Sequence, residues 1–142
     1  MKRVVGIVLI GSALLLILAG CMSLPGLKLS ATATIIRVEE TSIDALEISY
    51  EIKNTGDLGI DYYEIYFTGK LSDGSTISDW TNGLNVLPGN THADTTYFST
   101  GGQDVQEVAV TKIILKNHEY DREVTIDIET PQWVPVPYNA GE

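Results

Sequence analysis

One stretch decides the fold of this chain, Leu-Glu-Ile-Ser-Tyr-Glu-Ile-Lys at residues 46–53. Apolar side chains occupy every second position, and charged or small polar side chains occupy the positions between them. Successive side chains of a β-strand point to opposite faces, whereas those of a helix repeat every 3.6 residues. The stretch therefore predicts a half-buried strand of an antiparallel sheet, with Ile48 and Tyr50 facing a core and Glu51 facing water.

The flanking sequence contains turn signals that separate further predicted strands. Asn54-Thr55-Gly56-Asp57 is typical of a tight reversal. Asp73-Gly74 indicates a hairpin turn, and Pro88-Gly89-Asn90 indicates another reversal. The remaining predicted strands cover residues 31–38, 60–71, 76–80, 84–87, 92–100, 108–116 and 122–128.

Seven or eight short strands separated by turns are typical of an all-β sandwich or barrel. We predict a single antiparallel β-sandwich, immunoglobulin-like in topology, over residues 31–130. Three prolines follow in residues 131–142, and they predict an extended or loose C-terminal tail.

The order of turns between Ile48 and Gly89 resembles that of several immunoglobulin-like families. These are the FxLYD-type domains of prokaryotic envelope proteins and the late-embryogenesis-abundant-14-like and CARDB-like sandwiches. Leu71 and Asp73 match the Phe-x-Leu-Tyr-Asp motif of the first family, and Gly69 and Ser72 depart from it. Since these families share no catalytic residues, the resemblance implies an architecture and no active site.

The first twenty residues have the pattern of a secretory signal. Lys2 and Arg3 precede an apolar run, Val4 to Leu18, that is interrupted only by two glycines and a serine. Leu18-Ala19-Gly20-Cys21 then resembles the lipobox of bacterial lipoproteins at every position. The resemblance implies cleavage between Gly20 and Cys21 and a diacylglyceryl thioether on the cysteine sulfur.

Residues 21–30 are then expected to form a lipidated tether, which Ser23, Pro25 and Gly26 keep free of regular structure. Two acyl chains on one residue suffice for stable membrane anchoring. The alternative is an uncleaved membrane-spanning helix, because no charge appears between Arg3 and Lys28. Either interpretation places the sandwich outside the cytoplasm, attached to the cell membrane.

Charge bears on the partners that the exported chain could bind. Residues 21–142 keep seven of the nine Lys and Arg and all 19 Asp and Glu, a net charge of −12. Such a balance argues against nucleic acid, whose phosphates require Lys and Arg. The excess of acid is consistent with solubility, and a cationic ligand is the alternative.

The chain offers little for catalysis or for metal binding. Of its two histidines, His92 follows the predicted reversal at residues 88–90 and His118 lies in a predicted hairpin loop, and its single thiol is that of Cys21. A nucleophile needs a base within hydrogen-bonding reach, so a hydrolytic enzyme is the less favoured function. Carboxylates in the turns could hold calcium but usually bond their own backbone. We expect no enzyme activity, no cofactor and no metal.

Aromatic residues provide the candidate ligand site. Tyr62 and Tyr66 share one face of the strand at residues 60–71, opposite Phe67, and Trp80 stands on a neighbouring edge. The three could form a platform that stacks on sugar rings, or they could simply pack against neighbouring strands. We therefore expect a membrane-anchored envelope module for binding or assembly, with an envelope protein as partner. A carbohydrate-binding module is the alternative.

Overall fold

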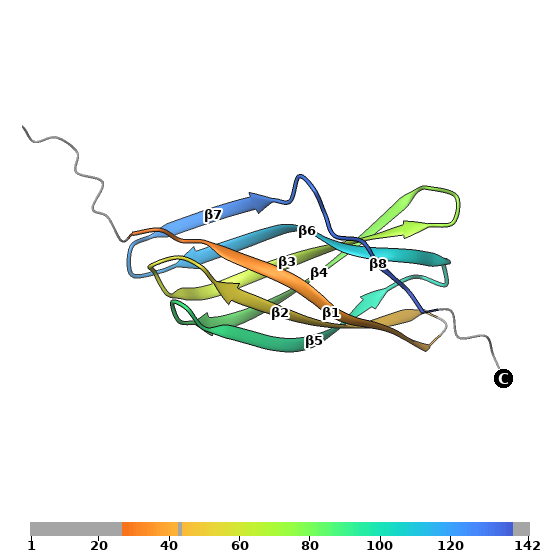
Figure 1. Cartoon of the computed structure of the whole chain (residues 1–142), viewed down its shortest axis with the longest axis horizontal. Coiled ribbons are helices and arrows are strands. Elements are labelled where there is room, and N and C mark those ends of the chain that lie inside the picture. Colours follow the sequence, from red (N-terminus) through yellow and green to blue (C-terminus); the bar gives the residue numbers. More distant parts are fainter. Residues whose placement is uncertain (1–26, 43, 138–142) are drawn as a thin grey trace, which may run out of the picture.

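The computed structural model of the chain describes residues 27–42 and 44–137. The predicted signal peptide, Gly20 and Cys21 lie outside the described residues. Eight strands form two antiparallel sheets (Figure 1): β1 (Ala31–Ser42), β2 (Ala45–Asn54), β3 (Ile60–Leu71), β4 (Thr76–Val86), β5 (Thr91–Ser99), β6 (Val105–Asn117), β7 (Arg122–Asp127) and β8 (Val134–Pro135). In this described part we find no helix with the length and hydrophobicity of a membrane span.

The first sheet has the order β1-β2-β5, and the second has the order β4-β3-β6-β7. The short strand β8 pairs with the first half of β6, on the side where β7 pairs with the second half. Constant-type immunoglobulin domains keep their fourth strand in the sheet of the first, second and fifth strands. Here β4 pairs with β3 instead. The predicted antiparallel immunoglobulin-like sandwich is confirmed, with β4 in the other sheet.

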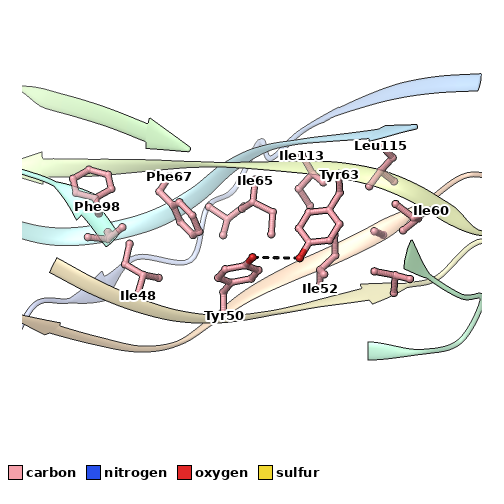
Figure 2. Close-up of a cluster of buried hydrophobic side chains, with 14 of the residues drawn as sticks. Ile48, Tyr50, Ile52, Ile60, Tyr63, Ile65, Phe67, Phe98, Ile113 and Leu115 are labelled. Carbon is pink, nitrogen blue, oxygen red and sulfur yellow. Dashed lines mark hydrogen bonds between the residues drawn. The ribbon is translucent and has the colours of Figure 1, made fainter. Parts of the chain in front are cut away.

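The core lies between the sheets and contains the residues that the alternating pattern placed there. Ile48, Tyr50 and Ile52 of β2 are buried, whereas Glu51 is exposed. Figure 2 shows Tyr50 from the first sheet and Tyr63 from the second meeting through their hydroxyl groups, 3.2 Å apart. Each buried hydroxyl thereby has a partner, which removes the cost of burying it alone.

The predicted turn after β2 is organised by a buried side chain. Asn54 Nδ2 donates to the carbonyl oxygens of Leu58 (2.8 Å) and Val86 (2.9 Å), and Asn54 Oδ1 accepts the amide of Gly56 (2.9 Å). Two amides of the turn also donate to the carbonyl oxygen of Lys28. The turn therefore holds together the end of β4 and the segment that enters β1.

Two predicted short strands, at residues 76–80 and 84–87, are a single strand, β4. The predicted gap between residues 80 and 84 does not occur, because Gly83 pairs with Tyr63 and the tyrosine ring lies directly against its backbone. Asn85, which adopts a positive φ of 57°, marks the irregular end of the strand. An isolated glycine in a strand often marks a close approach of this kind.

Part of the predicted tail is ordered against the sandwich. Val134 pairs with Val108 of β6, and the Nζ atom of Lys70 lies 4.2 Å from the ring centroid of Trp133. Residues 138–142 lie outside the described range.

Candidate functional site

The outer surface of the second sheet carries the aromatic residues that the sequence singled out. Strand register places Tyr66 between Trp80 of β4 and Lys112 of β6, and Tyr62 between Leu84 and Lys116 of the same strands. Glu64 stands between the two tyrosines on β3. We call this surface the aromatic face and define it by Tyr62, Glu64, Tyr66, Trp80, Leu84, Lys112 and Lys116.

Tyr66 is covered on both sides of its ring. The Trp80 ring stacks on it with centroids 6.2 Å apart and an interplanar angle of 24°. The ammonium nitrogen of Lys112 lies 3.9 Å from the tyrosine centroid, a cation–π contact. Since β4 and β6 flank β3 on opposite sides, the indole and the ammonium group approach the tyrosine from opposite sides.

Tyr62 is held in a similar but looser way. Lys116 Nζ lies 5.6 Å from the Tyr62 ring centroid and 3.1 Å from a carboxylate oxygen of Glu123 on β7. The ion pair with Glu123 raises the pKa of Lys116, so the ammonium group stays charged. On the other side, Leu84 is the register partner of Tyr62 on β4.

Glu64 joins the two tyrosines. Tyr62 Oη donates to its Oε1 atom (2.9 Å), and Tyr66 Oη donates to its Oε2 atom (2.6 Å). The bond from Tyr66 is the main reason why the pKa of Glu64 lies below its ordinary value. The same bond raises the pKa of Tyr66 above its ordinary value. The carboxylate thus fixes the orientation of both phenol groups.

Exposure differs across the aromatic face. Trp80 and Leu84, on the edge strand β4, are 50% and 60% exposed, whereas Tyr62 and Tyr66 are only partly exposed. Trp80 also has an open side, because among the described strands none pairs with β4 beyond it in the second sheet. A ligand would therefore meet the indole and the leucine first, and the edges of the tyrosine rings behind them.

The outer surface of the second sheet is close to neutral, unlike the chain as a whole. Three lysines and four carboxylates share it by strand register: Lys70, Lys112, Lys116, Glu64, Glu107, Glu123 and Asp127. The outer surface of the first sheet is polar along β2, where Glu47, Ser49 and Glu51 alternate with core residues. Its large exposed apolar groups are Ile36 and Tyr97.

The other candidates are dispersed. His92 Nε2 lies 3.8 Å from a carboxylate oxygen of Asp94, and His118 Nδ1 lies 3.8 Å from Asp61. Asp73 accepts hydrogen bonds from the amide and hydroxyl of its neighbour Ser75, as turn carboxylates commonly do. In residues 27–42 and 44–137, no group of three His, Cys, Asp or Glu side chains could hold a metal ion.

Sequence reasoning did not single out Glu64, Lys112 and Lys116 as members of the site. Alternation along β3 placed Glu64 on the face of the two tyrosines. The lysines belong to β6, and their contact with Tyr62 and Tyr66 depends on a register that contains a bulge between Tyr66 and Phe67. Nothing local in the sequence specifies that register.

Comparisons with known proteins give only distant structural similarities. No protein-family model and no curated protein sequence matches the chain. IrmA from Escherichia coli is similar in structure at 12% identity and a TM-score of 0.49, over 71% of this chain and 87% of its own. A structural genomics target, SoR45, is 11% identical in sequence, with a TM-score of 0.49. The match covers 80% of this chain and 87% of the SoR45 chain.

Beta-glucosidase 3B from Thermotoga neapolitana, determined with α-D-glucose, gives 13% identity and a TM-score of 0.39. The match covers 75% of this chain and 17% of the glucosidase chain. At these levels of similarity, nothing about a ligand or an activity follows.

Proposed function

We propose that this chain is a lipid-anchored protein of the cell envelope whose sandwich binds another protein and catalyses no reaction. The anchor is proposed from the sequence, where a basic head, an apolar run and Leu18-Ala19-Gly20-Cys21 follow one another. The binding role is proposed from the aromatic face. The observation that supports the binding role is that Trp80 and Leu84 are exposed next to two tyrosines that are both hydrogen-bonded to Glu64.

Protein interfaces depend on a few large side chains, among which Trp and Tyr are enriched. Affinity is greatest when these side chains are already fixed before binding, because little conformational entropy is then lost. Tyr66 is fixed by Trp80, Lys112 and Glu64 together. The near-neutral surface also lets a partner approach a chain that is otherwise strongly acidic.

A glycan is the second candidate, and Trp80 alone favours it. Stacking on a sugar requires an uncovered ring face, and both sides of Tyr66 are occupied by neighbouring side chains. Trp80, at the sheet edge, keeps an open side. A carbohydrate module here would therefore rest on one indole and not on a platform of three rings.

Site-specific photo-crosslinking in the producing cells tests the proposal. A photoreactive residue at Leu84 should give a discrete protein adduct, and Trp80→Ala should abolish that adduct. The matched control is Tyr97, 64% exposed on the outer face of the other sheet, where a photoreactive residue should give no such adduct. Equal adducts from both positions would contradict the proposal. The glycan candidate replaces the protein partner if two results are obtained together. No protein adduct forms, and peptidoglycan fragments quench the tryptophan fluorescence of the unmodified chain but not that of the Trp80→Ala variant.

A further inference from the structure

The sandwich has two sides where an edge strand of one sheet faces an edge of the other sheet, and these two sides differ in the charge of their side chains. Where β4 faces β5, polar side chains point inward: Asp79, His92 and Asp94 are register partners of the core residues Phe67, Ile52 and Tyr50. The amide of Ser99 on β5 also donates to Asp79 Oδ2 on β4, at 2.9 Å. Inward-pointing charged residues are a known device that keeps sheet edges from pairing with other chains. This side of the sandwich is therefore protected.

The opposite side, between β1 and the β7–β8 segment, has no such protection. β1 pairs with β2 along one edge, and in the described part of the chain no strand pairs with its other edge. Beside this free edge lies a cavity of about 360 Å³. Its lining comes from both sheets: Ala31, Thr32, Ala33, Thr34, Ile35, Val110, Ile126, Ile128, Thr130, Gln132 and Val134.

Small side chains explain why this cavity exists. Ala31 and Ala33 occupy inward positions of β1, opposite Asn54 and Ile52 of β2, and each fills only the space of a methyl group. On the other wall, β6 pairs with β7 from Lys112 onward and with β8 up to Val108. The chain between β7 and β8 loops outward (Figure 1), so among the described strands none pairs with this edge of β6 at Ala109 and Val110, and the carbonyl oxygen of the next residue, Thr111, accepts the amide of Ile128.

The chemistry of the cavity is uniform. None of its lining residues carries a charge, and the rim is made of threonine and glutamine side chains. Ala33, Ile35, Ile126, Ile128 and Val134 are only partly buried although they pack against the core. Apolar surface is thus left open next to an unpaired strand edge.

We propose that the free edge of β1 and this cavity bind an extended segment of another protein by β-augmentation. The segment pairs with Ala31–Ile35 through main-chain hydrogen bonds, and every second side chain enters the cavity, as in other strand-addition complexes. Strand spacing of about 4.8 Å places those side chains beside Ala33 and opposite Ile126 and Ile128. The inward side chains are apolar, because the lining offers no charged partner.

Charge selects against a second copy of the chain as the occupant. Two copies of the chain, each with a net charge of −10, repel one another, and the cavity rim contributes no cation to offset the repulsion. The occupant is therefore an uncharged or basic segment of a different protein. This surface is separate from the aromatic face, and its occupation does not depend on the role proposed for Trp80.

The probe is a synthetic peptide of about eight residues, alternating threonine and valine with a lysine at each end, which is long enough for an ordinary strand. It is titrated into the purified full-length chain, and binding is followed by fluorescence anisotropy of a labelled peptide. Amide hydrogen exchange then locates the bound peptide. We expect slowed exchange at residues 31–35 and no change along β4 and β5. A peptide with glutamate at each end should bind more weakly.

Filling the cavity should block the peptide. Ala33→Leu from β1 and Ile128→Phe from the opposite wall should each weaken binding by about tenfold or more. Ala93→Leu is the matched control: Ala93 is exposed on β5, the other edge strand of the same sheet, and the substitution should leave binding unchanged. Unfolding midpoints of all three variants establish that each is folded.

The exchange map of the unmodified chain decides the site even if a variant fails to fold. Absence of binding, protection on β4 or β5, or full binding by both cavity-filled variants would overturn the proposal. So would dimerisation of the chain alone with slowed exchange at residues 31–35, since the occupant would then be a second copy.

Discussion

Gly83 shows how a single residue can limit the packing of the core. A Cβ atom at Gly83 would overlap both Cζ and Oη of Tyr63. The ring cannot easily move away, because Tyr63 is fully buried and its hydroxyl bonds Tyr50. We expect Gly83→Ala to destabilise the fold by ~1–3 kcal/mol or more, the usual cost of overpacking. Gly59→Ala, with open space around its Cβ position, should change the unfolding free energy by less than about 0.5 kcal/mol. Urea unfolding compares the two, and equal midpoints would contradict the argument.

Glu64 gives the aromatic face a dependence on pH. Its lowered pKa means that the carboxylate form of Glu64 stabilises the folded state. This stabilisation is fully present above the ordinary glutamate pKa of about 4.3. The contribution is lost as the pH falls through the lowered value. For Tyr66 the sign is opposite: its raised pKa favours the protonated phenol, and that contribution is lost as the pH rises above about 10.

Glu64→Gln therefore provides a test of the bridge. The unfolding midpoint of the variant should fall below that of the unmodified chain near neutral pH, and the difference should shrink below about pH 4. Thermal unfolding across the pH range measures it. A difference that stays constant between acidic and neutral pH would mean that the charge of the carboxylate is irrelevant to the face.

At the scale of elements, the turn after β2 connects sequence to assembly. Asn54 is fully buried, and its side chain bonds the carbonyl oxygens of Leu58 and Val86. Asn54→Ala leaves these groups without partners, at a cost of about 1–3 kcal/mol each for those that stay buried. Asn54→Asp should be worse near neutral pH, because a carboxylate then faces two carbonyl oxygens. Thr55→Ala, exposed in the same turn, is the control. Chemical unfolding should show the least damage for Thr55→Ala, more for Asn54→Ala and the most for Asn54→Asp.

Strands were predictable where alternation was strong. β2 buries every second side chain from Leu46 to Asn54, and β3 does so from Tyr63 to Gly69, so the period of two in the sequence was enough to assign their faces. β4 was predicted as two pieces, because the element depends on the Tyr63 ring packing against Gly83, a contact between strands. β1 extends past its predicted end at residue 38 through bulges near Ile36 and Thr41. The strand was predicted from the β-branched residues of 31–38, and the acidic residues Glu39 and Glu40 that continue it lack that composition.

At the scale of the whole molecule, the sequence predicted the two-layered fold and, of the aromatic face, only its three rings, Tyr62, Tyr66 and Trp80, but not their arrangement. Tyr66 and Trp80 meet because β4 pairs with β3 and not with β5, which is a choice of topology. The cavity beside β1 likewise depends on where β7 ends and β8 begins. Both features arise from pairings between segments distant in sequence, and local propensity does not encode them.

The proposed anchor fixes which end of the sandwich faces the membrane. The described chain begins at one end of the sandwich and stops at the opposite end (Figure 1). Residues 21–26 would span at most about 20 Å, so the end that carries Leu27 would lie close to the bilayer. Arg122 Nη1 donates to the carbonyl oxygen of Leu27 at 2.8 Å and holds this starting point against β7. The aromatic face and the β1 edge would then both be directed sideways, parallel to the membrane plane.

The anchor itself is tested at Cys21, whose thiol is the only one in the chain. Cys21→Ser should abolish labelling by a fatty-acid analogue and leave an unprocessed precursor, because no other side chain can accept the lipid. Ser23→Ala, two residues further on, should be labelled and processed normally. Intact mass spectrometry of the unmodified protein gives the complementary result: a chain that starts at Cys21 and carries acyl mass is expected. An unlipidated chain of residues 1–142 would instead favour a membrane-spanning N-terminal helix. The sandwich would still lie outside the cytoplasm in that case, but its distance from the bilayer would no longer be set by residues 21–26.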